Sequence, residues 1–144
     1  MAEFVTPDTV QTSFHVRFAE TDAMGIVHHS QYLVWFEEAR SAFMRAQGAS
    51  YVEFSAEGAA LAVAQAYVRH LSPAYYDRLV TVTCRVTEVK SRKINFEYTV
   101  IEAETGLLLA TGYTHHICID TTGAVTRIPE KWRKLWAEAI AAGA

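Results

Sequence analysis

The stretch ETDAMGIVHHSQY, residues 20–32, gathers ionisable side chains directly ahead of a strongly apolar helical pattern. Asp22 lies shortly before that pattern, where the unpaired backbone N–H groups of a helix N-terminus carry partial positive charge. Such N–H groups can polarise a carbonyl and stabilise an oxyanion, while a carboxylate can attack the carbon or activate a water. The combination is suited to acyl transfer, and His29 could add a donor or hold the carboxylate.

A purely structural interpretation of the same stretch stays open. Asp and Thr ahead of a helix commonly cap the helix or turn the chain. Gly25 fits either interpretation, because a glycine lets the backbone bend and also lets it approach a ligand closely.

Hydrophobic periodicity predicts the elements that flank this stretch. The first few residues are expected to be loose, and an alternating strand follows over residues 12–20 with Phe14 and Phe18 on one face. Ser30 is suited to the N-cap of the next element. From there apolar residues recur at helical spacing as far as Gly48, where a glycine can end the helix in a left-handed conformation. A helix that is apolar around most of its circumference must be wrapped by other elements.

Four further strands are predicted at residues 60–71, 79–90, 93–103 and 107–119. The short connections KSRK and ETG predict antiparallel pairing, and the four strands are expected to form a meander. A final helix is expected to start at Pro129, with Trp132 and Trp136 on its apolar face. This order predicts an α+β fold in which a five-stranded antiparallel sheet curls around one long central helix, with a short C-terminal helix. The outer face of the sheet is only partly polar, which predicts an isologous dimer.

Length and composition limit the classes of function. The 144 residues predict a single domain, residues 1–144, and the net charge of −3 argues against a nucleic-acid surface over the whole protein. The sequence shows neither a basic-then-apolar leader nor an apolar run approaching the ~20 residues of a membrane span. Cys84 and Cys118 lie in alternating runs and are expected to be buried free thiols. We therefore expect no membrane insertion and a location in the reducing cytoplasm.

The sequence ETDAMGIVHHSQYLVWFEEAR resembles the signature of the hotdog-fold acyl-CoA thioesterases of the 4-hydroxybenzoyl-CoA thioesterase type. More closely, it is similar to the bacterial branch encoded beside the Tol-Pal cell-envelope system. The family pattern runs Asp-Thr-Asp, two small or variable residues, Gly, apolar residues, His, two further residues and Tyr. The matching positions are Asp22, Gly25, Val27, His29 and Tyr32. Glu20 stands where the family has its first Asp, and the segment HLSPAYYDRLVTV resembles the family's Pro-x-x-Tyr-Asp segment.

The resemblance covers nearly the whole chain and implies a hotdog fold that hydrolyses an acyl-CoA, with the coenzyme A thioester as substrate and no cofactor. It implies Asp22 as nucleophile or general base and the backbone N–H of His29 as the oxyanion donor. Gly25 would shape the turn, and Val27 and Tyr32 would line the substrate pocket. It also implies a homo-oligomer, either a dimer with two interfacial sites or a dimer of dimers (homotetramer), with coenzyme A along the partner's sheet edge.

Two other groups of residues could take part. The turn KSRK packs three cations into four residues. Ser91, Arg92 and Lys93 are the candidates for binding the coenzyme A phosphates, with a solvated hairpin turn as the equally weighted alternative. His115 and His116 are adjacent on a predicted strand and point to opposite faces, so they cannot share a metal, and no metal site is expected.

Glu37 on the central helix is a second candidate carboxylate, because another branch of hotdog thioesterases takes its catalytic carboxylate from that helix. A solvated polar strip with Arg45 is the structural alternative. Two further functions stay open: a hotdog acyl-thioester dehydratase or hydratase, although the His-Phe-Pro-type loop is absent, and a non-catalytic acyl-CoA-binding module.

Overall fold

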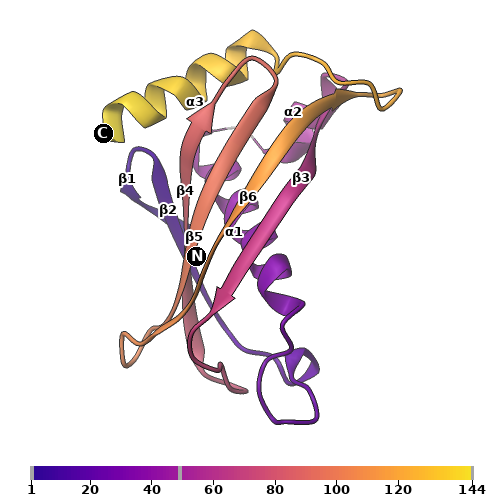
Figure 1. Cartoon of the computed structure of the whole chain (residues 1–144). Helices are drawn as coiled ribbons and strands as arrows, with labels where there is room; N and C mark the ends of the chain where they lie inside the picture. The colour runs from indigo at the N-terminus through magenta and orange to yellow at the C-terminus, as the bar shows by residue number, and fades with distance from the viewer. Residues whose placement is uncertain (1, 49, 144) are drawn as a thin grey trace.

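In the computed structural model, which describes residues 2–48 and 50–143, an antiparallel sheet packs one of its faces against a long helix (Figure 1). The elements are β1 (Ala2–Thr6), β2 (Thr9–His15), η1 (Phe18–Glu20), α1 (Gln31–Ala46), α2 (Tyr51–Ala56), β3 (Ala59–His70), β4 (Leu79–Val89), β5 (Lys93–Glu102), β6 (Leu108–Asp120) and α3 (Glu130–Gly143). The α+β class and the single long central helix are confirmed.

The sheet has six strands, in the order β1-β2-β4-β5-β6-β3. The prediction of five was wrong because the N-terminal residues, expected to be loose, form β1 and pair with β2. The predicted four-strand meander was also wrong, since β3 pairs with β6 instead of with β4. Only β4, β5 and β6 form the meander. As a result β3 lies at an edge of the sheet, beside α1.

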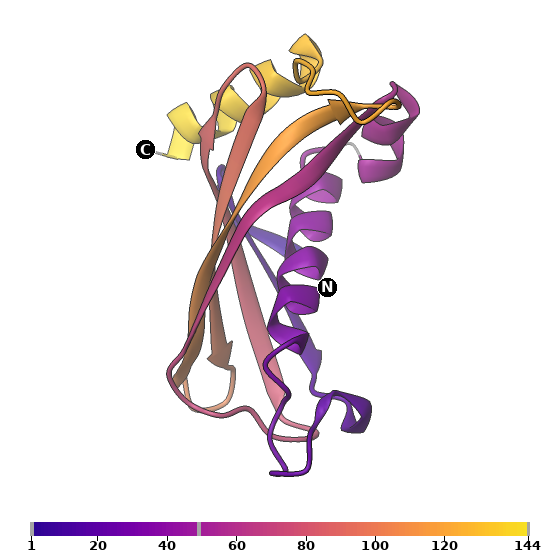
Figure 2. The same cartoon turned by 45° about the vertical axis from the view of Figure 1, so that its right-hand side comes forward.

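Helix α1 lies across one face of the sheet (Figure 2). Its buried side chains are Tyr32, Trp35, Phe36, Ala39, Ala42, Phe43 and Met44. The ring of Phe36 stacks on Tyr98 of β5 with 4.1 Å between the centroids. Gly48 has a φ of +88°, so the predicted left-handed end of the helix is confirmed.

The strand predicted over residues 12–20 is shorter than expected. β2 ends at His15, and the one-turn helix η1 follows at Phe18–Glu20. The carboxylate of Glu20 accepts a hydrogen bond from the backbone N–H of Arg17 at 2.7 Å, which closes this turn. Phe18 therefore leaves the sheet pattern and is 74% exposed, with its ring against that of Tyr76.

Helices α2 and α3 cover the end of the sheet at the top of Figure 1. Pro129 immediately precedes α3, and its carbonyl accepts hydrogen bonds from the first turn. Trp132 and Trp136 are buried and contact the ring of Phe54 on α2, so the predicted apolar face of α3 is confirmed. Both cysteines are buried free thiols, as expected. Among the helices of the described residues, none has the length and hydropathy needed to span a membrane.

Candidate active site

A cavity of about 360 Å³ lies where the N-terminal end of α1, the loop before it and the end of β3 meet. It is lined by Asp22, Met24, Ile26, Val27, His29, Tyr32, His70, Leu71, Ser72 and Pro73. Four of the predicted site residues, Asp22, Val27, His29 and Tyr32, therefore share one cavity. Residues 70–73, HLSP, also line it, so the two motifs recognised in the sequence meet here.

A tight loop presents Asp22 to this cavity. Thr21 and Val27 form an antiparallel bridge, and the backbone N–H of Asp22 donates to the carbonyl of Ile26 at 2.9 Å. Gly25 closes the tip, donating to the carbonyl of Asp22 at 3.0 Å. Its φ is +79°, and a Cβ placed there would meet no atom within 4 Å. The glycine is thus needed for its backbone conformation and not for close approach to another group.

The carboxylate of Asp22 has two roles available to it. Its Oδ1 accepts a hydrogen bond from the backbone N–H of Met24 at 2.8 Å, which forms a turn of the kind expected from a structural Asp. The side chain is half-buried and lines the cavity. One carboxylate oxygen therefore fixes the side chain while the other is left for chemistry.

The backbone N–H of His29 is a free donor at the helix start. The preceding N–H, that of His28, donates to the carbonyl of Glu20 at 2.9 Å. The following one, that of Ser30, donates to Nδ1 of His28 at 3.2 Å. Within the described part of the chain, the hydrogen bonds leave the N–H of His29 without a protein acceptor. It is available to an oxygen atom in the cavity, at the positive end of α1.

The two histidines of this stretch take different positions. Ser30 occupies the N-cap as predicted, but its hydroxyl caps no backbone N–H and instead bonds Nδ1 of His28 at 2.8 Å. The ring of His29 stacks on that of His28 with 4.2 Å between centroids. This contact holds the His29 side chain against the cavity wall.

Tyr32, which is buried, and His70, which is exposed, both line the cavity. The buried ring of Tyr32 meets that of His70 edge-on at 4.7 Å. Burial raises the pKa of Tyr32, and burial together with the charge of His29 lowers the pKa of His70. Both side chains are therefore uncharged at neutral pH. Sequence reasoning did not include His70 in the site, although it opens the second motif, HLSPAYYDRLVTV.

The turn with Ser91, Arg92 and Lys93 lies far from this cavity, at the opposite end of the sheet (Figure 1). The eleven residues of β4 separate the two ends, which is about 36 Å at ~3.3 Å per residue. The carbonyl of Ser91 accepts from the N–H of Ile128 at 2.8 Å, so the turn also anchors the chain before α3. The side chains of Arg92 and Lys93 are exposed. Within one protomer these three residues do not join Asp22.

The remaining candidates lie outside the cavity. Glu37 is exposed on α1 and does not line it. His116 is buried while His115 is partly exposed, so the two rings face opposite sides of the sheet as predicted. In residues 2–48 and 50–143 no three His, Cys, Asp or Glu side chains are grouped so that they could hold a metal ion.

Comparison with known proteins identifies relatives over most of the chain. The family model of the Thioesterase-like superfamily matches residues 16–136. A putative esterase of Aquifex aeolicus is 34% identical, with 81% of this chain and 88% of the relative covered. A putative acyl-CoA thioesterase of Bacillus subtilis is 31% identical, with 73% and 75% covered. The crystal structure of a DHNA-CoA thioesterase from Staphylococcus aureus superposes with a TM-score of 0.88 at 28% identity, covering 92% of this chain and 91% of that one.

Proposed function

The chain belongs to the thioesterase-like superfamily and is a thioester hydrolase with a hotdog fold, and we propose that it cleaves an acyl-CoA to a carboxylic acid and coenzyme A. Relatives named as acyl-CoA and DHNA-CoA thioesterases support a coenzyme A thioester as the substrate. The 4-hydroxybenzoyl-CoA type and the Tol-Pal branch, suggested by the opening motif, belong to this proposal. The reaction needs no cofactor, because a carboxylate, backbone N–H groups and water supply its chemistry.

One observation carries the proposal: the free oxygen of the Asp22 carboxylate and the unpaired N–H of His29 belong to residues that line the same cavity. A thioester carbonyl oxygen bound at the His29 N–H would be polarised at the positive end of α1. Asp22 then either attacks the carbonyl carbon or takes a proton from the attacking water. The C–S bond breaks and the coenzyme A thiolate leaves. When Asp22 is the nucleophile, its attack forms an acyl–aspartyl anhydride, which water then hydrolyses to release the carboxylic acid.

The walls of the cavity suit an acyl group next to this centre. Val27 and Tyr32 are buried and mainly apolar, and His70 is uncharged at neutral pH. Gly25 contributes through the turn that sets the position of Asp22.

Coenzyme A binding is proposed to involve a second copy of the chain. β3 is a twelve-residue edge strand, and most of its residues from Val63 onward are exposed. An exposed edge strand can pair with the same strand of another copy. Antiparallel pairing about a two-fold axis would bring the partner's KSRK turn toward the Asp22 end of the first protomer. Ser91, Arg92 and Lys93 could then bind the coenzyme A phosphates across the interface. Two such dimers would form a homotetramer by packing against each other through the sheet face that points away from α1.

The expected site of action is the cytoplasm. Cys84 and Cys118 are both free, which fits a reducing compartment.

The decisive experiment measures free-thiol release with Ellman's reagent over a panel of short, medium, long and aromatic acyl-CoAs. We expect Asp22→Asn to lower kcat by about 10²- to 10⁴-fold, the usual contribution of a positioned acid–base group. Glu37→Gln is the matched control, because it removes an exposed carboxylate that does not line the Asp22 cavity. Full turnover by Asp22→Asn would refute the catalytic role of Asp22. A loss of turnover in Glu37→Gln would assign that role to Glu37 instead. Binding without turnover by the wild type would indicate a non-catalytic acyl-CoA-binding module instead.

A further inference from the structure

His28 makes hydrogen bonds through both its backbone and its ring at the point where the chain enters α1. Its backbone N–H donates to the carbonyl of Glu20 at 2.9 Å, and its carbonyl accepts from the N–H of Gln31 at 3.0 Å. Nδ1 of its ring accepts from the N–H of Ser30 at 3.2 Å. One residue therefore joins the end of η1 to the first turn of α1.

The backbone bond to Gln31 sets the direction of the His29 N–H. The carbonyl of His28 and the N–H of His29 belong to one peptide group, and in a trans peptide these two bonds point in opposite directions. No peptide bond of the described residues is cis. Since Gln31 holds the carbonyl on the side of the helix, the His29 N–H points away from the helix.

The ring of His28 caps this end of the helix. Ser30 occupies the N-cap position, but its hydroxyl bonds no backbone N–H. A backbone N–H can only donate, so Nδ1 of His28 offers its lone pair to Ser30 and the ring hydrogen lies on Nε2. The hydroxyl of Ser30, 2.8 Å from the same Nδ1, donates to it as well. Of the N–H groups of residues 28–30, that of His29 is the one left without a protein acceptor in the described part of the chain.

The same ring also supports His29 directly. The two rings stack with 4.2 Å between their centroids and 30° between their planes. His28 is half-buried and does not line the Asp22 cavity, whereas His29 does. Any effect of the His28 ring on the reaction must therefore pass through its neighbours.

We propose that His28 is a positioning residue for thioester hydrolysis, an inference that rests on the function proposed above. Its ring occupies the N–H of Ser30 and holds His29, so that a single directed N–H is available to the thioester oxygen. Without the ring, the N–H of Ser30 becomes a competing donor and the turn loses its side-chain support. Donors of this kind act through a fixed direction, and a misplacement of about 1 Å can cost ~10²-fold in rate.

Two substitutions separate the hydrogen bond from the bulk of the ring. In His28→Leu the N–H of Ser30 loses its acceptor, and we expect kcat in the thiol-release assay to fall about 10- to 100-fold. KM should change little, because the ring does not line the cavity. In His28→Asn the side-chain oxygen can accept the N–H two residues on, as Asn commonly does in turns, so most of kcat should return. His15→Leu is the matched control, since His15 is exposed at the end of β2 and lies outside the cavity.

Nitrogen-15 NMR of histidine-labelled protein at mildly alkaline pH reads the ring itself. The spectrum distinguishes a ring with its hydrogen on Nε2 from one with its hydrogen on Nδ1, and we expect the Nε2–H form for His28. The signals lost in His28→Asn identify this ring among the six histidines.

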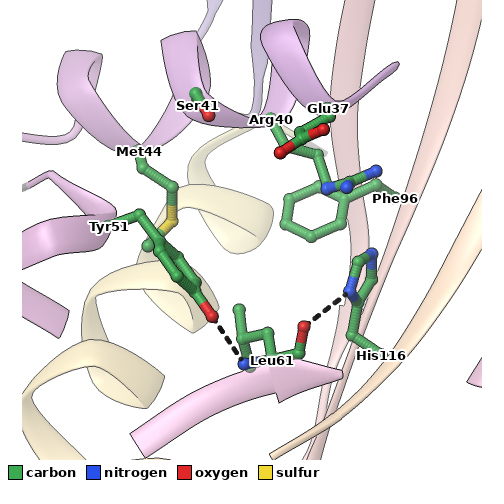
Figure 3. A pocket seen from close by; sticks show the side chains of 8 residues that line it. All are labelled: Glu37, Arg40, Ser41, Met44, Tyr51, Leu61, Phe96 and His116. Atoms are coloured by element: carbon green, nitrogen blue, oxygen red, sulfur yellow. Dashed lines mark hydrogen bonds between the residues drawn. The ribbon is translucent and has the colours of Figure 1, made fainter. Parts of the chain in front are cut away.

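His116 provides the opposite case in the same spectrum. Its Nδ1 lies 3.5 Å from the carbonyl of Leu61 (Figure 3), and a carbonyl can only accept. The ring is neutral because burial, with the charge of Arg40, lowers its pKa to about 4, so the hydrogen lies on Nδ1. Nε2 then accepts from the hydroxyl of Thr114 at 2.8 Å, at the end of a link of hydrogen bonds that begins at Arg40 and passes through Tyr98.

Asp22→Asn is assayed beside these variants, so that failure of this inference can be told from failure of the proposed function. Full turnover by Asp22→Asn would refute the function itself. If Asp22→Asn collapses, the role of His28 is overturned by full kcat in His28→Leu, by an equal loss in His28→Asn, or by an equal loss in His15→Leu. A His28 ring with its hydrogen on Nδ1 would overturn it as well.

Circular dichroism shows whether His28→Leu is folded. If it is not, the position of the hydrogen on the wild-type ring and the turnover of His28→Asn still decide the outcome.

Discussion

The carboxylate of Glu20 accepts a hydrogen bond from the indole N–H of Trp35 at 2.7 Å, which fastens the loop before α1 to the buried face of that helix. The guanidinium of Arg17 contacts the same carboxylate at 3.0 Å. The backbone carbonyl of Glu20 accepts from the N–H of His28 at 2.9 Å, so one residue holds both ends of the loop that carries Asp22. Burial by itself raises the pKa of Glu20, but the hydrogen bonds from Arg17 and Trp35 bring that pKa below its usual value.

Glu20→Gln is therefore expected to lower both stability and turnover. Loss of a charge-assisted hydrogen bond to a buried group typically costs about 1–3 kcal/mol in the free energy of unfolding. Turnover should fall as well, because the loop that positions Asp22 loses its anchor. Urea unfolding and the thiol-release assay measure the two effects. Glu38→Gln is the matched control, since its ion pair with Arg45 is more than half exposed on both sides and should contribute little.

Two glycine substitutions should separate backbone conformation from packing. Gly25→Ala meets no atom but must hold a φ of +79°, which costs an L-residue roughly 1–2 kcal/mol and should disturb turnover more than stability. In Gly112→Ala the new Cβ would lie 2.4 Å from the carbonyl oxygen of Tyr67 and 2.6 Å from the ring of Phe36. Such overpacking typically costs 1–3 kcal/mol or more, so we expect a larger loss of stability there. Thermal unfolding and kcat of both variants compare the two effects, and equal effects on both properties would contradict this distinction.

His116 should make stability depend on pH between about 4 and 6.5. Its pKa is about 4 in the folded protein and 6.5 in a model compound, so the unfolded chain binds more protons in this interval. The resulting stabilisation is complete above pH 6.5 and is lost as pH falls toward 4, a change on the order of 3 kcal/mol. Urea unfolding at several pH values should show a steeper dependence in the wild type than in His116→Gln. Parallel curves for the two proteins would refute a neutral, buried His116.

The two cysteines should not react with Ellman's reagent in the native protein. Burial raises the pKa of both Cys84 and Cys118, and neither thiol is accessible to solvent. Since the thiolate is the reactive form, Ellman's reagent should detect no protein thiol before denaturation and two per chain afterwards. Rapid reaction of the folded protein would contradict the burial of these residues.

Much of this protein follows from local sequence. The spacing of Tyr32, Trp35, Phe36 and Phe43 defines α1 and its buried face, because one helical turn decides which side chains share a side. The alternation in β4 and β5 defines their inward faces for the same local reason. The position of Asp22 ahead of a helix start and the match of its motif identified the candidate site, and the structure places Val27, His29 and Tyr32 with it.

The tertiary structure decided which distant segments meet. Alternation in β3 is compatible with pairing to β4 or to β6, because a strand's pattern records which face is buried and not which neighbour it has. For the same reason the sequence could not place the turn between β4 and β5 at the opposite end of the sheet from the loop before α1, or His70 beside Tyr32. The link from Arg40 through Tyr98 to His116 joins residues far apart in the chain, so only the packing of α1 on the sheet creates it.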